Sequence, residues 1–138
     1  MIELKRLSKN YNNSKILNEI SYIFPNTGLV AIVGESGCGK TTLLNCISLL
    51  TDYDGEIIID GTNLKSIPKN EVDFYRLKHF GFVFQDFKLF EDQTVFNNVC
   101  FPLNCLSNFT NKFKENYNVA RAFLDKVNYT YFKIDKTQ

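Results

Sequence analysis

The stretch GESGCGKTT, residues 34–42, lies between an apolar run, LVAIV at 29–33, and a run with helical periodicity, LLNCISLL at 43–50. It matches the pattern GxxxxGK[ST] in full, and a buried strand, a glycine-rich loop and a helix in this order are typical of a phosphate-binding loop. Its glycines allow backbone angles and close approaches that a side chain would prevent. A chance glycine-rich turn does not account for a complete match in this context.

Each part of the loop has a physical role. Successive backbone N–H groups form an anion-binding nest, and the helix that begins near Lys40 adds its positive N-terminal end. Lys40 can reach the β- and γ-phosphates, the Thr41 hydroxyl is suited to bind Mg²⁺, and Thr42 can donate to an earlier phosphate. For Cys38, a tolerated small residue is favoured over a redox role. The predicted nucleotide-binding residues of the loop are Gly34, Glu35, Ser36, Gly37, Cys38, Gly39, Lys40, Thr41 and Thr42.

The composition excludes several classes of protein. The chain has 138 residues, 44% of them hydrophobic, and a formal net charge of +1. This balance is typical of a globular domain and gives no basic field for nucleic acid. The four cysteines form no CxxC pair, so neither zinc nor a disulfide framework is expected. The first ten residues lack the apolar core of a signal peptide, and no run approaches the ~18 apolar residues of a membrane span.

Hydrophobic periodicity predicts alternating strands and helices. The apolar run LVAIV suits a parallel strand buried on both faces. The following helix places Leu43, Leu44, Ile47 and Leu50 on one face. Turns are predicted at 11–14, 26–28 and 54–55. Strands are predicted over 2–7, 15–24, 29–33, 56–60 and 80–85, and helices over 40–50, 71–78, 94–106 and 112–127.

Beyond the loop, nearly the whole chain resembles the ATP-binding subunits of ABC transporters. Residues 2–50 resemble the opening of that family, and DYDGEIIIDGTNL, residues 52–64, resembles its strand pair S-G-x-I-x-I-D-G. GFVFQDFKLFEDQTVFNNVCFPL, residues 81–103, resembles its Q-loop and the following segment, with lipoprotein-release, macrolide-type and antimicrobial-peptide exporters as the nearest subfamily. The resemblance implies an α/β fold: a P-loop NTPase core with a partial parallel sheet and helices, an antiparallel β subdomain, and the start of a helical subdomain.

The resemblance also implies roles for individual residues. Tyr11 falls at the A-loop aromatic that stacks on adenine, against the alternative of an exposed tyrosine in a turn. Gln85 falls at the Q-loop glutamine, which reaches Mg²⁺ and the attacking water. Lys40 and Gln85 are thus the expected catalytic residues, and Thr41 and Gln85 the expected metal ligands. The implied cofactors are ATP and Mg²⁺. The implied partners are a transmembrane permease and a second ATP-binding subunit, at the cytoplasmic face of the cell membrane and without direct membrane insertion.

Two features imitate functional motifs. The run Ile57–Asp60 has the apolar residues and terminal acid of a Walker B strand, but Gly61 follows instead of a second carboxylate. We interpret it as an antiparallel strand that ends in an Asp-Gly turn. His79 precedes the Q-loop, whereas the switch histidine of the family lies beyond Walker B, so we interpret His79 as a structural or surface residue.

The sequence also departs from the family. It contains no LSGGQ signature, no Walker B Asp-Glu pair and no switch histidine, and it stops at KVNYTYFKIDKTQ, which resembles the helical segment before the signature. We therefore expect residues 1–138 to be the N-terminal portion of one ABC-type ATP-binding domain. With no side chain placed to activate water, the expectation is nucleotide binding without turnover. An exposed edge strand and apolar surface are also expected.

Three readings remain open from the sequence. One is part of a transport ATPase, another is a nucleotide-binding or interaction fragment without catalysis, and the third is an ABC-type ATPase outside transport. The segment 86–103 favours transport because it resembles exporters at the permease-facing position. A nucleoside kinase is disfavoured because its lid needs clustered arginines, and the three arginines here lie far apart at Arg6, Arg76 and Arg121.

Overall fold

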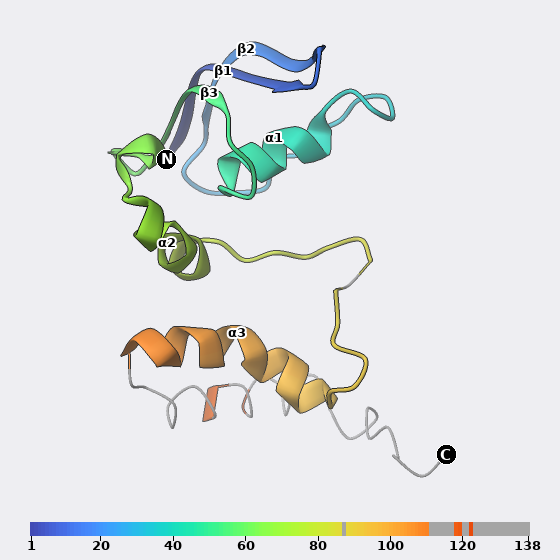
Figure 1. Ribbon diagram of the computed structural model, residues 1–138, viewed down its shortest axis with the longest axis vertical. Coiled ribbons are helices and arrows are strands. Elements are labelled where there is room, and N and C mark those ends of the chain that lie inside the picture. Colours follow the sequence, from blue (N-terminus) through green and yellow to red (C-terminus); the bar gives the residue numbers. More distant parts are fainter. Residues whose placement is uncertain (87, 111–117, 120–121, 123–138) are drawn as a thin grey trace. The chain divides into compact units, whose positions relative to one another are not determined.

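The computed structural model describes residues 1–86, 88–110, 118–119 and 122 (Figure 1). These residues fall into two compact units, Met1–Arg76 and Leu77–Gln138, which are described separately. The elements in chain order are β1 (Ile2–Tyr11), β2 (Ser14–Phe24), α1 (Lys40–Ile47), β3 (Asp54–Ile59), β4 (Thr62–Asn63), the 3₁₀ turns η1 (Leu64–Ser66) and η2 (Lys69–Glu71), α2 (Val72–His79) and α3 (Val95–Thr110).

The first unit is built on an antiparallel sheet with the strand order β2-β1-β3-β4. A two-residue turn at Asn12 and Asn13 joins β1 to β2, and Asn12 adopts φ 50°, which asparagine tolerates better than most residues. Asp60 and Gly61 form the matching turn between β3 and β4. These hairpins confirm the strands predicted over 2–7 and 15–24. They also confirm the interpretation of Ile57–Asp60 as an antiparallel strand with an Asp-Gly turn.

Gly55 lies within β3, so the turn predicted at 54–55 is wrong. Its φ of 86° and a shift of the β1–β3 register between Lys5 and Ser8 mark an irregularity of the ladder. A Cβ atom on Gly55 would lie 2.3 Å from the carbonyl oxygen of Arg6. The glycine therefore allows β1 and β3 to approach each other where the ladder is irregular.

The core of the first unit lies between the sheet and α1, which packs against β2 (Figure 1). Leu4, Leu7 and Ile57 are buried on the sheet, and Cys46 and Ile47 are buried on the helix. The predicted apolar face of residues 40–50 is correct only in part, because α1 ends at Ile47, Leu44 on the helix is exposed, and Leu50 lies beyond the helix and is also exposed.

The two runs predicted as parallel strands, 29–33 and 80–85, are not strands. Their apolar side chains are exposed, to 97% at Leu29 and 100% at Val83. A parallel strand takes its backbone partners from segments distant in sequence. Among the described residues, the strands all belong to the antiparallel sheet, and neither run is one of them.

In the second unit, residues 88–94 lead into α3, a helix that contains Pro102. The helices predicted over 71–78 and 94–106 are confirmed by α2 and α3. The helix predicted over 112–127 lies outside the described residues, apart from 118, 119 and 122. Over the described ranges, the helices are all too short or too polar to span a bilayer.

Candidate nucleotide-binding site

The loop 34–39 leads directly into α1, as the sequence predicts. Gly39 occupies the N-cap position with φ 98°, and Gly37 has φ 82°, both in the left-handed region that glycine enters without strain. No side chain caps this helix and its first turn contains no acidic residue. In the part of the chain that the structure describes, the positive end of α1 thus has neither a side-chain cap nor an acidic residue in its first turn to offset it.

The glycines also permit close packing around the loop. A Cβ on Gly34 would lie 2.7 Å from the Cys38 sulfur. A Cβ on Gly39 would lie 3.1 Å from side-chain carbons of Ile16 and Leu17 on β2. The loop is thus folded tightly on itself and is supported by β2, the second strand of the first hairpin. This cradle is built from backbone, as phosphate binding requires.

Lys40 is the charged group at the centre of the loop. Its Nζ donates to the carbonyl oxygens of Gly34 at 2.8 Å and Glu35 at 2.6 Å, and lies 3.7 Å from the Cys38 sulfur. The ammonium is therefore held across the loop at the start of α1. The next two residues, Thr41 and Thr42, are exposed and half-buried, respectively. The predicted loop residues 34–42 are thus brought together in one segment of the first unit.

Tyr11 ends β1 beside the hairpin turn and is 45% exposed. The Nζ of Lys9 lies 5.0 Å from the centre of its ring and donates to Asp52 at 2.6 Å. This hydrogen bond raises the pKa of Lys9 and lowers that of Asp52. Tyr11 belongs to the same unit as the loop, because the hairpin that carries it continues into the β2 residues packed against Gly39.

Gln85 and His79 fall in the second unit. Gln85 is exposed in a turn after residues 80–84, which form neither a strand nor a helix. His79 is exposed at the end of α2, which agrees with its interpretation as a surface residue. Within the described ranges, His, Cys, Asp and Glu side chains form no group of three or more that could hold a metal ion.

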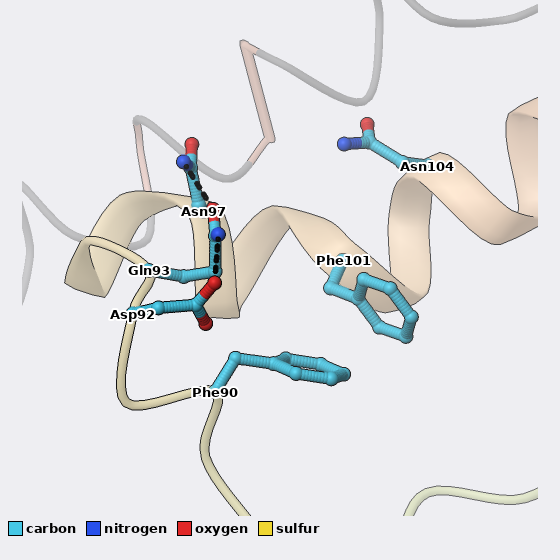
Figure 2. Close-up of a pocket in the computed structure, with 6 residues that line it drawn as sticks. All are labelled: Phe90, Asp92, Gln93, Asn97, Phe101 and Asn104. Carbon is cyan, nitrogen blue, oxygen red and sulfur yellow. Dashed lines mark hydrogen bonds between the residues drawn. The ribbon is translucent and has the colours of Figure 1, made fainter.

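A cavity that the sequence did not predict lies in the second unit along α3 (Figure 2). It has a volume of about 470 Å³. Phe90 from the preceding loop and Phe101 from α3 are in contact, with ring centres 4.6 Å apart. The loop is fastened to the helix by Asn98, which accepts from the Phe90 N–H at 2.8 Å and donates to its carbonyl at 3.1 Å. The lining residues are Phe90, Asp92, Gln93, Asn97, Phe101 and Asn104.

Polar side chains form one side of this cavity. Gln93 donates to Asp92 at 3.1 Å, and Asn97 donates to Gln93 at 3.0 Å, as the dashed lines in Figure 2 show. The spacing of residues 97, 101 and 104 places them on one face of a helix, which is a signal that the sequence contained. The contribution of Phe90 depends on the loop and could not be read from periodicity.

Comparison with known proteins gives consistent matches. The sequence profile described as ABC transporter matches residues 17–138. The methionine import ATP-binding protein MetN of Clostridioides difficile is 37% identical over 106 residues, which cover 76% of this chain and 33% of MetN. The sulfate/thiosulfate import ATP-binding protein CysA of Pseudomonas syringae is 46% identical over 103 residues, covering 74% of this chain and 30% of CysA.

A solved structure confirms the fold class. The ATP-binding cassette MJ0796, in a dimeric post-hydrolysis state bound to ADP and Pi, superposes with a TM-score of 0.77 at 30% identity. The match covers 91% of this chain and 56% of that one. The chain thus shares the P-loop NTPase fold of these cassettes. It spans about a third of the length of the curated relatives MetN and CysA.

Proposed function

The chain belongs to the ABC transporter family, and from this we propose that it binds ATP with Mg²⁺ through residues 34–42 as part of the ATP-binding subunit of a transporter. The observation that carries the proposal is the loop itself. It combines glycines with left-handed backbone, a helix N-terminus with no side-chain cap and no acidic residue in its first turn, and one ammonium group held across the loop. These are the donors that a chain of phosphates needs.

The individual residues follow from this geometry. The backbone N–H groups of 34–39 and the Lys40 ammonium would hold the phosphates. Phosphate oxygens would replace the Gly34 and Glu35 carbonyls as the acceptors of the Lys40 ammonium. The Thr41 hydroxyl would be one ligand of Mg²⁺ and Gln85 the other expected protein ligand, with phosphate oxygens and water completing the set, because magnesium retains much of its hydration. When bound, Mg²⁺ supplies charge neutralisation at the phosphates. Tyr11 would stack on adenine, and Gln85 would reach Mg²⁺ and the attacking water.

For the 138-residue chain by itself we expect binding without appreciable hydrolysis. The sequence contains no Asp-Glu pair after an apolar strand, and Asp60 lies in a hairpin turn. No carboxylate is therefore available in the Walker B position to accept a proton from water.

We also propose that the partners are a permease and a second ATP-binding subunit at the cytoplasmic face of the membrane. The cavity along α3 supports the permease contact, because it lies in the segment 86–103 that resembles exporters at their permease-facing position. MetN and CysA carry import in their names, whereas residues 81–103 favour an exporter. Co-purification of the chain with an importer-type or an exporter-type permease, which requires no hydrolysis, would distinguish the two.

The experiment that tests nucleotide binding is calorimetric titration of the chain with Mg-ATP. Removing the ammonium in Lys40→Ala should weaken binding about 10- to 100-fold, because hydrogen bonds to charged groups contribute ~1.5–3 kcal/mol each. Lys69→Ala, at an exposed lysine of the same unit, is the matched control and should leave the affinity unchanged. Equal affinities for the natural chain and Lys40→Ala would refute the proposal.

A further inference from the structure

A lysine with a packed side chain places its ammonium near the aromatic ring of Tyr11, the last residue of β1. The side chain of Lys9 is only 7% exposed, although lysine is rarely buried unless it is paired. Its Nζ donates to the carboxylate of Asp52, which is itself 94% exposed, and lies 5.0 Å from the centre of the Tyr11 ring. The phosphate-binding loop uses none of these three groups.

The position of Lys9 connects two parts of the first unit. Lys9 and Tyr11 are on β1, whereas Asp52 lies in the segment that connects α1 to β3. The hydrogen bond between Lys9 and Asp52 therefore joins β1, which carries Tyr11, to the segment between α1 and β3. The phosphate-binding loop leads into α1, so this segment is close to it in the sequence. The packed side chain of Lys9 and its hydrogen bond to Asp52 together hold the ammonium in place.

The Lys9 ammonium acts on the orientation of the Tyr11 ring. A cation near the face of an aromatic ring is attracted to it, and this attraction grows when the cation is shielded from water. Tyr11 is left with 45% of its surface exposed. A ring held by a fixed cation loses less conformational freedom when a planar ligand stacks on its open part.

We propose that Lys9 is a positioning residue for the base of the nucleotide: with Asp52 as its anchor, its ammonium holds the Tyr11 ring in place for stacking. This inference rests on the proposed function, because it needs Tyr11 to contact the base. It assigns to Lys9 and Asp52 a role in the affinity for the base and none in the affinity for the phosphates.

The experiment uses the absence of tryptophan from the chain. Tyr11→Trp introduces a single indole at the site, whose emission reports stacking of a base. Two probes are titrated, Mg-ATP and magnesium tripolyphosphate, the second of which has the phosphates but no base. In this background Lys9→Met removes the ammonium and keeps the apolar stem.

The expected result is a selective loss. Lys9→Met should weaken ATP binding ~3- to 10-fold and reduce the quenching of the indole, as expected for loss of a partly shielded cation–π contact. The affinity for tripolyphosphate should stay within about twofold, since the phosphate loop is untouched. Lys9→Arg should restore ATP binding, and Lys5→Met, at an exposed lysine of the same strand, should change neither affinity. Asp52→Asn should act in the same direction as Lys9→Met.

The outcomes separate this inference from the proposed function. If Tyr11→Ala in the natural chain lowers the affinity for ATP but Lys9→Met does not, the positioning role is refuted and the base contact stands. If Tyr11→Ala leaves the affinity for ATP unchanged, both the base contact and the role of Lys9 are refuted, while phosphate binding stands. If Lys9→Met weakens ATP and tripolyphosphate binding equally and Lys9→Arg does not restore it, Lys9 is a structural residue and the inference is wrong.

Discussion

The antiparallel sheet and the two apolar runs at 29–33 and 80–85 all contain large apolar residues but differ in structure. Leu7 and Ile57 in the sheet are fully buried, whereas Leu29 and Val83 in the runs are almost completely exposed. The strands of the sheet include two hairpins closed by two-residue turns, so that much of their pairing is local. Parallel pairing requires long crossover connections. Apolar composition therefore produces burial only where the backbone also finds a neighbour.

The largest effect is expected from truncating a leucine in each region. Leu7→Ala removes a fully buried side chain from the sheet and should lower the free energy of unfolding of the first unit by about 2–5 kcal/mol. Leu29→Ala makes the same chemical change in the exposed run, and its free energy of unfolding should stay within about 0.5 kcal/mol of that of the natural chain. Urea denaturation followed by circular dichroism measures both. Similar losses for the two variants would mean that residues 29–33 are buried in solution.

Two glycines with similar backbone angles provide the next comparison. Gly55→Ala adds a Cβ 2.3 Å from the Arg6 carbonyl oxygen at a residue with φ 86°. It should lower the free energy of unfolding by about 3 kcal/mol, because alanine is strained in the left-handed region and β1 and β3 must move apart. At Gly61, φ is 83° and no atom lies within 4 Å of an added Cβ. Gly61→Ala should therefore lower the free energy of unfolding by about 1 kcal/mol. Thermal unfolding of both variants measures the difference. If the two costs are the same, the close approach of β1 and β3 does not constrain this position.

A smaller effect is expected from the ion pair between Lys9 and Asp52. The hydrogen bond from Lys9 holds the pKa of Asp52 below its usual range, so the unfolded state takes up a proton first as the pH falls. The stabilisation is present above the unfolded-state pKa of aspartate and is lost as the pH falls through the lowered folded-state pKa. Asp52→Asn should therefore be less stable than the natural chain at neutral pH, and the difference should shrink in acid.

This pH dependence is measured by melting temperatures along an acid series. Asp54→Asn makes the same chemical change two residues away and serves as the control. A difference between Asp52→Asn and the natural chain that stays constant down to strongly acidic pH would contradict the assignment.

The smallest effect on stability is expected on the exposed face of the second run. Val83→Lys places a charge where the natural side chain is fully exposed, so the free energy of unfolding should change by less than about 0.5 kcal/mol. Exposed apolar segments promote association, and a lysine opposes it. Sedimentation at increasing concentration should show less self-association in the variant. Ile57→Lys is the contrasting variant, because the same charge in the sheet core should unfold the first unit.

Much of the candidate site could be predicted because its chemistry is local. The pattern GxxxxGK[ST] places the glycines, Lys40, Thr41 and Thr42 within nine consecutive residues, and the helix after them follows from periodicity. Tyr11 and Gln85 could be named only through the resemblance to a family, since a tyrosine in a turn or a glutamine after an apolar run is common. The cavity along α3 was missed because it depends on how Phe90, in a loop, meets Phe101 on the helix.

The sequence by itself determined the elements that need only near neighbours: the two hairpins, α1 to α3, and the phosphate-binding loop. The tertiary structure alone decided which apolar segments are buried, where the ladder becomes irregular at Gly55, and which partner Lys9 finds at Asp52. The physical reason is distance along the chain. A turn, a cap or a helical face is fixed by residues a few positions apart, whereas a strand pair or a buried charge is fixed by segments that folding alone brings together.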